Sequence, residues 1–448
     1  MSKLQFLTDR FLECPNKPAI AFRDEHLSYG ELAKQIDYAR QELHDKRIGA
    51  GSVVILLGDY SPLAVAMLIS LFDIGAILVP ITPDALSNLE SSLPQLAADW
   101  TIDVSGEKAK YVAAVDKVDT PALYSGMIER GSPGLVLFTS GSSGTPKAVV
   151  HDFSKLLTKF QKRRNALITI NFLLFDHWGG LNTLLHCLSN LCLIVIPRRR
   201  TPEAVCELIE KHKVELLPTT PSFLSMLVIS HADKQYDLSS LKMITYGAEP
   251  MPASILKRLN SLFPKIDIRQ TYGMIELGVL RAKTRSPDSL WMKMGGEGYD
   301  VRVVEGMLEI KAESAMLGYL NAPSPYTEDG YFMTGDRVEV DGEWMHVLGR
   351  ESDLINVGGQ KAYPAEIENV LFECAEVDNA VVFADKNPIL GHIVAAKIVL
   401  KPEIDKKQAR RSILAACSLA LEKFKVPSKI SFVDNIPQTG RLKRKRRF

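Results

Sequence analysis

The stretch Leu135-Val136-Leu137-Phe138-Thr139-Ser140-Gly141-Ser142-Ser143-Gly144-Thr145-Pro146-Lys147-Ala148-Val149-Val150 is the most informative part of this chain. Its two ends are short apolar runs, which are typical of buried β-strands. Between these runs lie two glycines, five hydroxyl side chains and one lysine. Glycine lets backbone N–H groups approach a ligand closely, and successive inward amides form an anion-binding loop. The stretch therefore predicts a strand, a polyphosphate-binding loop that ends at Lys147, and a second strand.

Length and composition limit the class of protein. The chain has 448 residues, of which 46% are hydrophobic and 24% are charged, and its formal net charge is +1. This length suits one large domain and a smaller one. The small net charge gives no reason to expect a nucleic-acid partner or an anionic membrane surface. The six cysteines contain no C-x-x-C pair, so we expect a reducing cytoplasm, no disulfides and no cysteine metal site.

The most apolar region of the sequence runs from Val53 to Ile81, and Asp59, Pro62 and Asp73 interrupt it. A membrane-spanning helix needs about twenty predominantly apolar residues with few charges. We therefore expect no membrane span in this region, and instead a strand at Val53–Leu57, a helix at Pro62–Ile74 and a strand at Ile77–Ile81.

Strand-like runs alternate with amphipathic helical patterns before Val301, which favours mainly parallel sheets covered by helices. From Val301 the pattern changes to short strands joined by turns, which predicts a small antiparallel or barrel-like subdomain. After Arg350 the pattern is compact α+β. We therefore expect an α/β fold, with a large N-terminal domain in residues 1–350 and a small C-terminal α+β domain in residues 351–448.

The loop at Thr139–Lys147 differs from a P-loop, which needs glycine directly before its lysine and Ser or Thr after it. Its spacing matches S/T-S/T-G-S/T-T/S-G-x-P-K, and here the chain resembles the adenylate-forming superfamily of acyl-CoA synthetases, adenylation domains and luciferases. A flexible surface hairpin is the alternative. The resemblance implies that the loop binds ATP through Thr139, Ser140, Gly141, Ser142, Ser143, Gly144, Thr145 and Lys147.

Two further segments resemble nucleotide motifs of this superfamily. Gln270–Glu276 is similar to Y-G-x-T-E, which implies that Tyr272 and Gly273 contact adenine and that Glu276 binds Mg²⁺ and acts in catalysis. Mg²⁺ prefers hard oxygen ligands of this kind. The usual threonine is Ile275 here, so one phosphate donor is lost. Tyr331–Asp336 and Gly349-Arg350 are similar to Y-x-T-G-D and G-R, which implies ribose contacts from Asp336 and Arg350.

The acid site is less clearly marked. Tyr246–Pro250 resembles a wall shared by the adenine and acyl sites, which implies roles for Gly247, Ala248 and Glu249 beside the nucleotide and for Tyr246 and Met274 beside the substrate. Phe175–Leu181 is similar to the family's aromatic–His–x–G–G segment, which places His177 beside the reacting carboxylate and Trp178 in the pocket. Another register puts Asp176 where amino-acid-activating relatives bind the substrate amino group. The sequence leaves both registers open.

The C-terminal motifs imply a domain that moves. Residues 349–361 resemble the family's hinge-and-loop motif, with Ser352 at the hinge and Lys361 in place of the usual arginine near the α-phosphate. Gly358 and Gly359 leave room for a pantetheine arm. Pro437–Arg446 is similar to P-x-T-x-x-G-K-x-x-R, which implies that Lys443 is the catalytic lysine. A solvated basic tail is the alternative reading of this end.

The resemblance implies an AMP-forming ligase that activates an aromatic or short-to-medium carboxylic acid with ATP and Mg²⁺ and transfers it to CoA. A stand-alone adenylation enzyme, which loads the phosphopantetheine of an acidic acyl carrier protein, is one alternative. A nucleotide-binding protein with decayed catalysis is another, because Ile275, Ser352 and Leu442 depart from the family pattern.

Replacing Lys443 with alanine is expected to abolish ATP–pyrophosphate exchange and to leave thioester formation from synthetic acyl-AMP largely intact. The reason is that the lysine offsets negative charge that develops only in the adenylation step. Separate assays of the two half-reactions test this expectation, and an equal loss in both would contradict it.

Overall fold

The computed structural model describes residues 4–115, 118–139, 146–388 and 390–436. The loop residues Ser140–Thr145 and the lysine at position 443, for which the sequence predicts phosphate binding and catalysis, lie outside the described residues.

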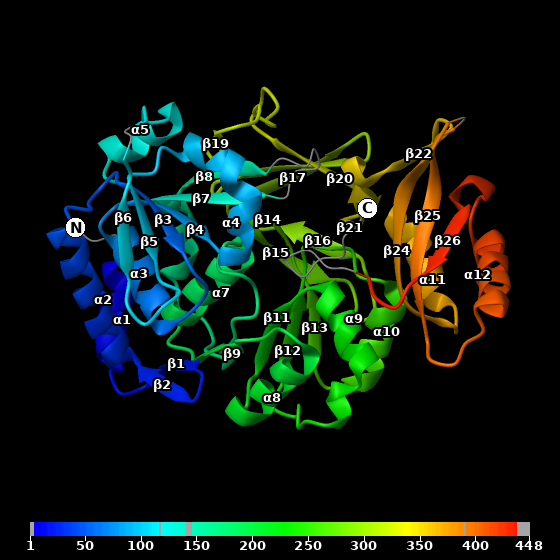
Figure 1. Cartoon of the computed structure of the whole chain (residues 1–448), viewed down its shortest axis with the longest axis horizontal. Coiled ribbons are helices and arrows are strands. Elements are labelled where there is room, and N and C mark those ends of the chain that lie inside the picture. The colour runs from blue at the N-terminus through cyan, green and yellow to red at the C-terminus, as the bar shows by residue number, and fades with distance from the viewer. Residues whose placement is uncertain (1–3, 116–117, 140–145, 389, 437–448) are drawn as a thin grey trace.

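Two seven-stranded sheets form the body of the molecule (Figure 1). The first is mainly parallel, and the second is mixed, with three parallel and three antiparallel strand pairs. Apolar runs bounded by turn residues form their central strands, as expected for strands buried on both faces. The first sheet has the order β13 (Asp267–Gln270), β12 (Met243–Tyr246), β11 (Leu216–Thr219), β9 (Thr169–Ile170), β10 (Ile194–Ile196), β1 (Pro18–Phe22) and β2 (Glu25–Ser28). The second has the order β19 (Gly318–Tyr319), β8 (Lys147–Asp152), β7 (Gly134–Thr139), β4 (Ile77–Ile81), β3 (Val53–Leu57), β5 (Trp100–Asp103) and β6 (Lys110–Ala113).

Helices fill the space between these sheets and cover their outer faces. One hydrophobic core joins inner-face residues of both sheets to α1 (Gln5–Glu13), α2 (Tyr29–Asp45), α3 (Pro62–Asp73), α6 (Phe153–Leu157) and α7 (Trp178–Ser189). A second core packs α8 (Pro202–His212), α9 (Pro221–Ser230) and α10 (Ala253–Leu262) on the first sheet. A third core packs α4 (Pro83–Leu89) and α5 (Ala122–Glu129) on the second sheet.

Local sequence signals begin several of these helices. Ser28 and Glu31 form a capping box at α2, in which each side chain bonds the other residue's backbone N–H. Ser61 and Thr201 cap α3 and α8, and each is followed by a proline in the first turn. These caps fix the residues at which α2, α3 and α8 begin after the preceding strands.

The third sheet is antiparallel and also has seven strands, in the order β14 (Tyr272–Met274), β15 (Gly278–Thr284), β16 (Met292–Gly295), β21 (Trp344–Arg350), β20 (Phe332–Asp341), β18 (Met307–Ala312) and β17 (Tyr299–Val304). Its buried side chains join the core between the first two sheets. The sheet therefore packs against the first two sheets and presents its β20–β21 end to the site described below.

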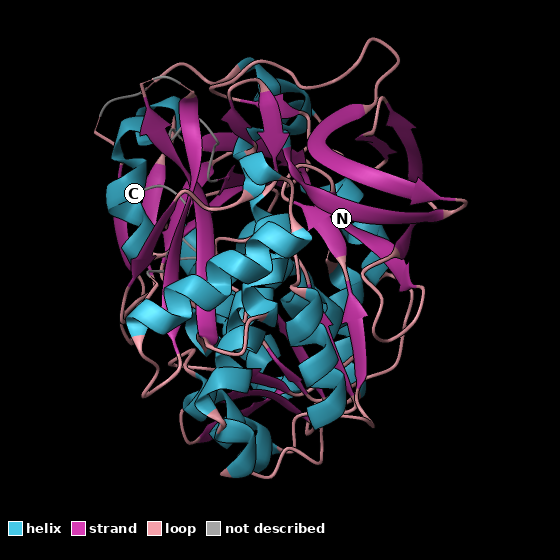
Figure 2. Cartoon of the chain, turned by 90° about the vertical axis from the view of Figure 1, so that its right-hand side faces the viewer, coloured by secondary structure: helices cyan, strands magenta, loops and turns pink. Residues whose placement is uncertain are grey.

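The C-terminal part is an α+β unit at one end of the molecule (Figures 1 and 2). It contains β22 (Ile355–Val357), β23 (Gln360–Ala362), α11 (Pro364–Glu373), β24 (Val377–Asn387), β25 (Gly391–Leu400), α12 (Lys406–Ala420) and β26 (Lys429–Phe432), around a core of its own. The Ala253 N–H of α10 donates to Asn369 Oδ1 of α11 at 3.3 Å.

The predicted fold class is confirmed: an α/β N-terminal part with mainly parallel sheets is followed by a short-stranded subdomain and a small α+β unit. The strands predicted at Val53–Leu57 and Ile77–Ile81 are β3 and β4 with the same bounds. The two strands that flank the glycine-rich loop are antiparallel neighbours, so this loop joins a hairpin inside a mixed sheet. Among the described helices, none has the length and apolarity needed to cross a membrane.

A buried histidine ties the second sheet to the third. His151 on β8 is 1% exposed, and its Nε2 lies 2.7 Å from the backbone carbonyl oxygen of Ile275, which follows β14. Burial lowers the pKa of His151 to about 4. The ring is therefore neutral at physiological pH, and Nε2 donates the bond to Ile275.

Replacing His151 with glutamine is expected to reduce the loss of stability in mild acid. The unfolded chain, with a histidine pKa of about 6.5, binds more protons than the folded chain between pH 6.5 and 4, so wild-type stability falls across this window by up to about 3 kcal/mol. Glutamine donates a similar bond and does not titrate. Denaturant unfolding at both ends of the window measures the difference, and equal losses in both proteins would contradict the assignment.

Candidate active site

Two neighbouring cavities open where the sheets meet. The larger, of 1430 Å³, lies between the first two sheets, the β20–β21 end of the third sheet and the C-terminal unit. The smaller, of 110 Å³, lies beside the start of α7. Leu174, Ala248, Thr271 and Gly273 line both cavities. A ligand in the larger cavity therefore lies next to a ligand in the smaller one.

A buried carboxylate forms one wall of the larger cavity. Asp336 on β20 is 7% exposed; its Oδ2 accepts a bond from the Tyr272 hydroxyl at 2.5 Å, and its Oδ1 accepts one from Arg350 Nε at 3.2 Å. Strand pairing places Asp336 opposite Arg350. Burial and then the Asp336 charge raise the pKa of Tyr272, so this hydroxyl stays protonated. The structure thus brings together three residues that the sequence assigns to one nucleotide.

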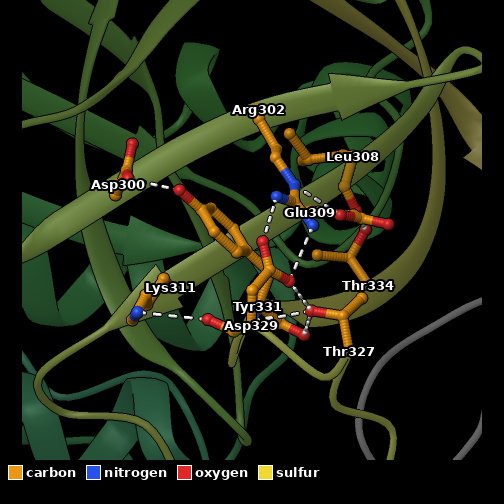
Figure 3. Close-up of polar contacts among 9 residues, drawn as sticks. All are labelled: Asp300, Arg302, Leu308, Glu309, Lys311, Thr327, Asp329, Tyr331 and Thr334. Carbon is orange, nitrogen blue, oxygen red and sulfur yellow. Dashed lines mark hydrogen bonds and ion pairs between the residues drawn. The ribbon is translucent and has the colours of Figure 1, made fainter.

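The segment that leads to Asp336 is anchored by Arg302 of β17 (Figure 3). The Arg302 guanidinium donates to Glu309 at 2.7 Å and to both oxygens of Asp329 at 2.5 and 3.1 Å, and it stacks 3.7 Å from the centre of the Tyr331 ring. The Tyr331 hydroxyl in turn bonds Asp300. These contacts fix the chain just before β20 and so restrict where Asp336 lies.

Lys147 and Glu276 are two of the described residues that the sequence assigns to the phosphates and the metal, and neither lines either cavity. Lys147 begins β8, directly after the glycine-rich loop. Glu276 is 7% exposed, and its Oε1 accepts a bond from the Tyr319 hydroxyl at 2.9 Å. In the described part of the chain no further bond reaches Oε2, and a carboxylate oxygen left in this way fits Mg²⁺. Ile275 is 5% exposed and packs in the core, so it lines neither cavity.

The structure separates the two registers that the sequence leaves open at the start of α7. His177 caps this helix, with Nδ1 accepting from the Gly179 N–H at 3.0 Å, and lines the smaller cavity together with Trp178 and Met274. Asp176 lines the larger cavity, where its Oδ2 accepts from the Thr82 hydroxyl at 3.2 Å. The two neighbouring residues therefore line different cavities.

The segment after β12 forms the partition between the cavities. A Cβ on Gly247 would lie 2.5 Å from Thr271 Oγ1 and 2.7 Å from its carbonyl oxygen, so the strand ends could not approach this closely with a side chain there. Ala248 adopts a left-handed φ of +68°, which is strained for a residue with a Cβ. Glu249 lines the larger cavity and accepts from the Ser222 hydroxyl at 2.6 Å.

Tyr246 requires a correction. The sequence places it beside the substrate, but its side chain is 1% exposed and packs in the core between the first sheet and helices α8–α10. It lines neither of the two cavities. Because residues alternate between the faces of a strand, the last residue of β12 points to the helix side, and the chain turns toward the cavities only at Gly247.

The C-terminal unit contributes polar groups to the larger cavity. Ser352 and Lys361 are exposed and line it. Gly358 and Gly359 form the turn between β22 and β23 with φ of +56° and +93°, and they lie outside both cavities. Ser352, the predicted hinge, and Lys361, the predicted α-phosphate residue, therefore lie in the wall of the larger cavity. Gly358 and Gly359, which are predicted to leave room for the pantetheine arm, lie on the surface.

Sequence reasoning missed polar residues whose partners are distant in the chain. The Tyr319 hydroxyl bonds Glu276, which is 43 positions away in the sequence. Arg200 bonds Asp59, which is 141 positions away, with 3.1 Å between Arg200 Nη1 and Asp59 Oδ2, and both residues line the larger cavity. No local spacing marks such pairs. The Gly-Tyr pair at 318–319, set between two strands, is the nearest signal to Tyr319.

Family models match most of the chain. The AMP-binding enzyme model matches residues 7–305, and the model of the AMP-binding enzyme C-terminal domain matches residues 366–443. The chain belongs to the AMP-binding enzymes. The resemblance drawn from the loop at Thr139–Lys147 and its companion motifs is confirmed.

Two curated relatives match over nearly their whole length. The chain is 26% identical to an indoleacetate–CoA ligase of Aromatoleum aromaticum, over 95% of this chain and 93% of that one. It is 25% identical to a 2-succinylbenzoate–CoA ligase of Bacillus pumilus, over 100% of this chain and 97% of that one. A crystal structure of the anthranilate CoA ligase AuaEII with anthranoyl-AMP shares the fold, with a TM-score of 0.83 and 20% sequence identity. The superposition covers 99% of this chain and 95% of that one.

Replacing Tyr272 with phenylalanine is expected to raise the KM for ATP about tenfold. The change removes one hydrogen bond to a buried carboxylate and keeps the ring that lines the cavity. Tyr246→Phe is the matched control, because it removes a hydroxyl from the core and should change the KM less than about twofold. Steady-state kinetics at varied ATP measures both variants, and equal effects would contradict the assignment.

Proposed function

We propose that this AMP-binding enzyme is an AMP-forming acid–thiol ligase that activates an aromatic or short-to-medium carboxylic acid and transfers it to CoA. The observation that carries the proposal is the shared wall of the two cavities at Ala248, Thr271 and Gly273. An acid in the smaller cavity has its carboxylate next to a nucleotide held in the larger one. The curated relatives, which are CoA ligases of aryl and related acids, support the acceptor.

In the first step a carboxylate oxygen of the acid attacks the α-phosphorus of ATP, and the bond to the β-phosphate oxygen breaks to release pyrophosphate. The protein contributes position and charge. Asp336 accepts bonds from the ribose hydroxyls, while Tyr272 and Arg350 hold Asp336 in place. Lys147 and Glu276 lie on the phosphate side. Glu276 would hold Mg²⁺, which would supply positive charge that offsets the negative charge of the phosphates.

In the second step the thiol sulfur attacks the acyl carbon, the thiol proton passes to solvent, and the C–O bond to AMP breaks. His177, at the start of α7 and on the wall of the smaller cavity, lies on the acid side of this reaction. Lys443 serves the first step, and rotation of residues 351–448 about Ser352 brings the Gly358-Gly359 turn in for the second. All six cysteines are free thiols, which fits a cytoplasmic enzyme.

The size of the smaller cavity limits the acid. A cavity of about 150 Å³ holds benzene. The smaller cavity, of 110 Å³, is below that size, so a ring seated in it would extend into the larger cavity across their shared wall. The apolar lining of the smaller cavity from Trp178, Met274 and Val279 favours an apolar acyl group. We therefore expect a single ring or a short chain as the preferred acyl group.

A screen of pyrophosphate release across aryl, short-chain, long-chain and amino acids tests the proposal. We expect release with one-ring or short-chain acids, at least tenfold slower release with long-chain acids, and an acyl-CoA product by mass spectrometry. Pyrophosphate release that yields a product only with a phosphopantetheinylated carrier protein would support the stand-alone adenylation enzyme instead. ATP binding without pyrophosphate exchange for any acid would support decayed catalysis and overturn the proposal.

A further inference from the structure

One short segment contacts both charged groups on the phosphate side. This bridging segment, Met316–Asn321, contains β19 and runs antiparallel to β8. The Leu317 N–H donates to the Val150 carbonyl at 2.7 Å, and the Leu320 N–H donates to the Ala148 carbonyl at 2.9 Å. The bridging segment is therefore fixed in register beside the strand that begins with Lys147.

The side chain of Asn321 holds the backbone on both sides of Lys147. Its Oδ1 accepts from the Ala148 N–H at 2.9 Å, and its Nδ2 donates to the Pro146 carbonyl at 2.9 Å. An amide is suited to this because it carries one acceptor and one donor group on the same carbon. These two bonds fix where the glycine-rich loop ends and β8 begins.

Tyr319 lies between the two charges. Its hydroxyl donates to Glu276 Oε1 at 2.9 Å, and the Lys147 ammonium lies 5.0 Å from the centre of its ring. The Met316 N–H also donates to the Glu276 backbone carbonyl at 2.8 Å. Both the backbone and the side chain of Glu276 are thus held by the bridging segment.

This arrangement keeps the two charges ready for a ligand. Lys147 and Glu276 form no ion pair with each other or with another described residue. A tyrosine between them satisfies one side of each group: the ring attracts the ammonium, and the hydroxyl bonds one carboxylate oxygen. The remaining ammonium hydrogens and the second carboxylate oxygen stay available.

We propose that Tyr319 and Asn321 are positioning residues for the polyphosphate site, with Tyr319 orienting Glu276 toward the metal-bound phosphates and Asn321 fixing the backbone of Lys147. The proposal rests on the proposed function, because it takes ATP as the ligand. It assigns separate parts to the two side chains: the Tyr319 hydroxyl acts through the metal ligand, and Asn321 acts through the lysine. The two parts predict different dependence on Mg²⁺.

The first test compares Tyr319→Phe with Tyr111→Phe. Tyr111 makes the same type of bond, from its hydroxyl to Glu42 Oε2 at 3.0 Å, between β6 and α2. The dissociation constant of ATP is measured by titration calorimetry with Mg²⁺ and, separately, with EDTA. We expect Tyr319→Phe to weaken binding about tenfold with Mg²⁺ and less than twofold with EDTA, since the ring beside Lys147 remains. Tyr111→Phe should change neither value.

The second test uses Asn321→Ala, with Asn260→Ala as its control. Asn260 also donates through Nδ2 to a proline carbonyl, that of Pro287 at 2.9 Å, away from the site. Because Asn321 acts on the Lys147 backbone, its loss is expected to weaken ATP binding severalfold both with Mg²⁺ and with EDTA. Adenylation should slow accordingly, while thiol transfer from synthetic acyl-AMP should keep the wild-type rate.

Three results would overturn the inference. The first is a dissociation constant of ATP that is the same for Tyr319→Phe as for Tyr111→Phe, and the second is a loss of affinity in Tyr319→Phe that is equal with Mg²⁺ and with EDTA. The third is a dissociation constant that is the same for Asn321→Ala as for Asn260→Ala. For Tyr319→Phe, the EDTA measurement on the same sample separates a local effect from unfolding, which lowers both affinities together. For Asn321→Ala, the unchanged rate of thiol transfer from synthetic acyl-AMP makes this separation. Failure of the wild-type protein to bind ATP in either medium would refute the proposed function itself and is distinct from these variant results.

Discussion

The position of the candidate site depends on strand β8 being paired along both edges. On one edge it pairs with β7, with Asp152 opposite Gly134 at one end and Lys147 opposite Thr139 at the other. On the other edge it pairs with β19. Ala148 and Val150 face one core and Val149 faces another. A slip of one residue would send each of these side chains to the wrong face and would move Lys147 and His151 with them. Because β8 is buried on both faces, its register with β7 and β19 fixes where the glycine-rich loop ends.

The same constraint acts in the third sheet and connects distant parts of the chain. Pairing of β20 with β21 places Asp336 opposite Arg350, and β14 delivers Tyr272 to the same carboxylate. The buried Asp336 carboxylate is costly to desolvate, but hydrogen bonds from Tyr272 and from the half-exposed Arg350 satisfy both of its oxygens. The hydrogen bond from His151 to the residue before Glu276 then joins this sheet to the second one. The residues that the sequence assigns to the nucleotide, the phosphates and the acid thus lie on sheets that are joined to one another.

Much of this frame was predictable because its signals are local. Apolar runs of five residues predicted β3 and β4 with their true bounds, and the spacing of the glycine-rich loop pointed to the family. Asp336 and Arg350 were singled out because each lies in a short motif, and the structure places them opposite each other; their contact with a ribose stays a prediction. Tyr246 was placed wrongly, because a motif gives no strand face. Tyr319 and Asn321 were missed, because their partners at Glu276 and Ala148 are remote in sequence.

The sequence by itself determined the family, the α/β fold class and the nucleotide as the ligand, since these depend on residue types at short spacing and on hydrophobic period. Only the tertiary structure decided which of Asp176 and His177 faces which cavity, how small the acid cavity is and which side chains support the charged groups. Those outcomes depend on the direction of each side chain at a helix start or strand end. They also depend on contacts between segments that meet only after the sheets have packed, and no local pattern encodes either.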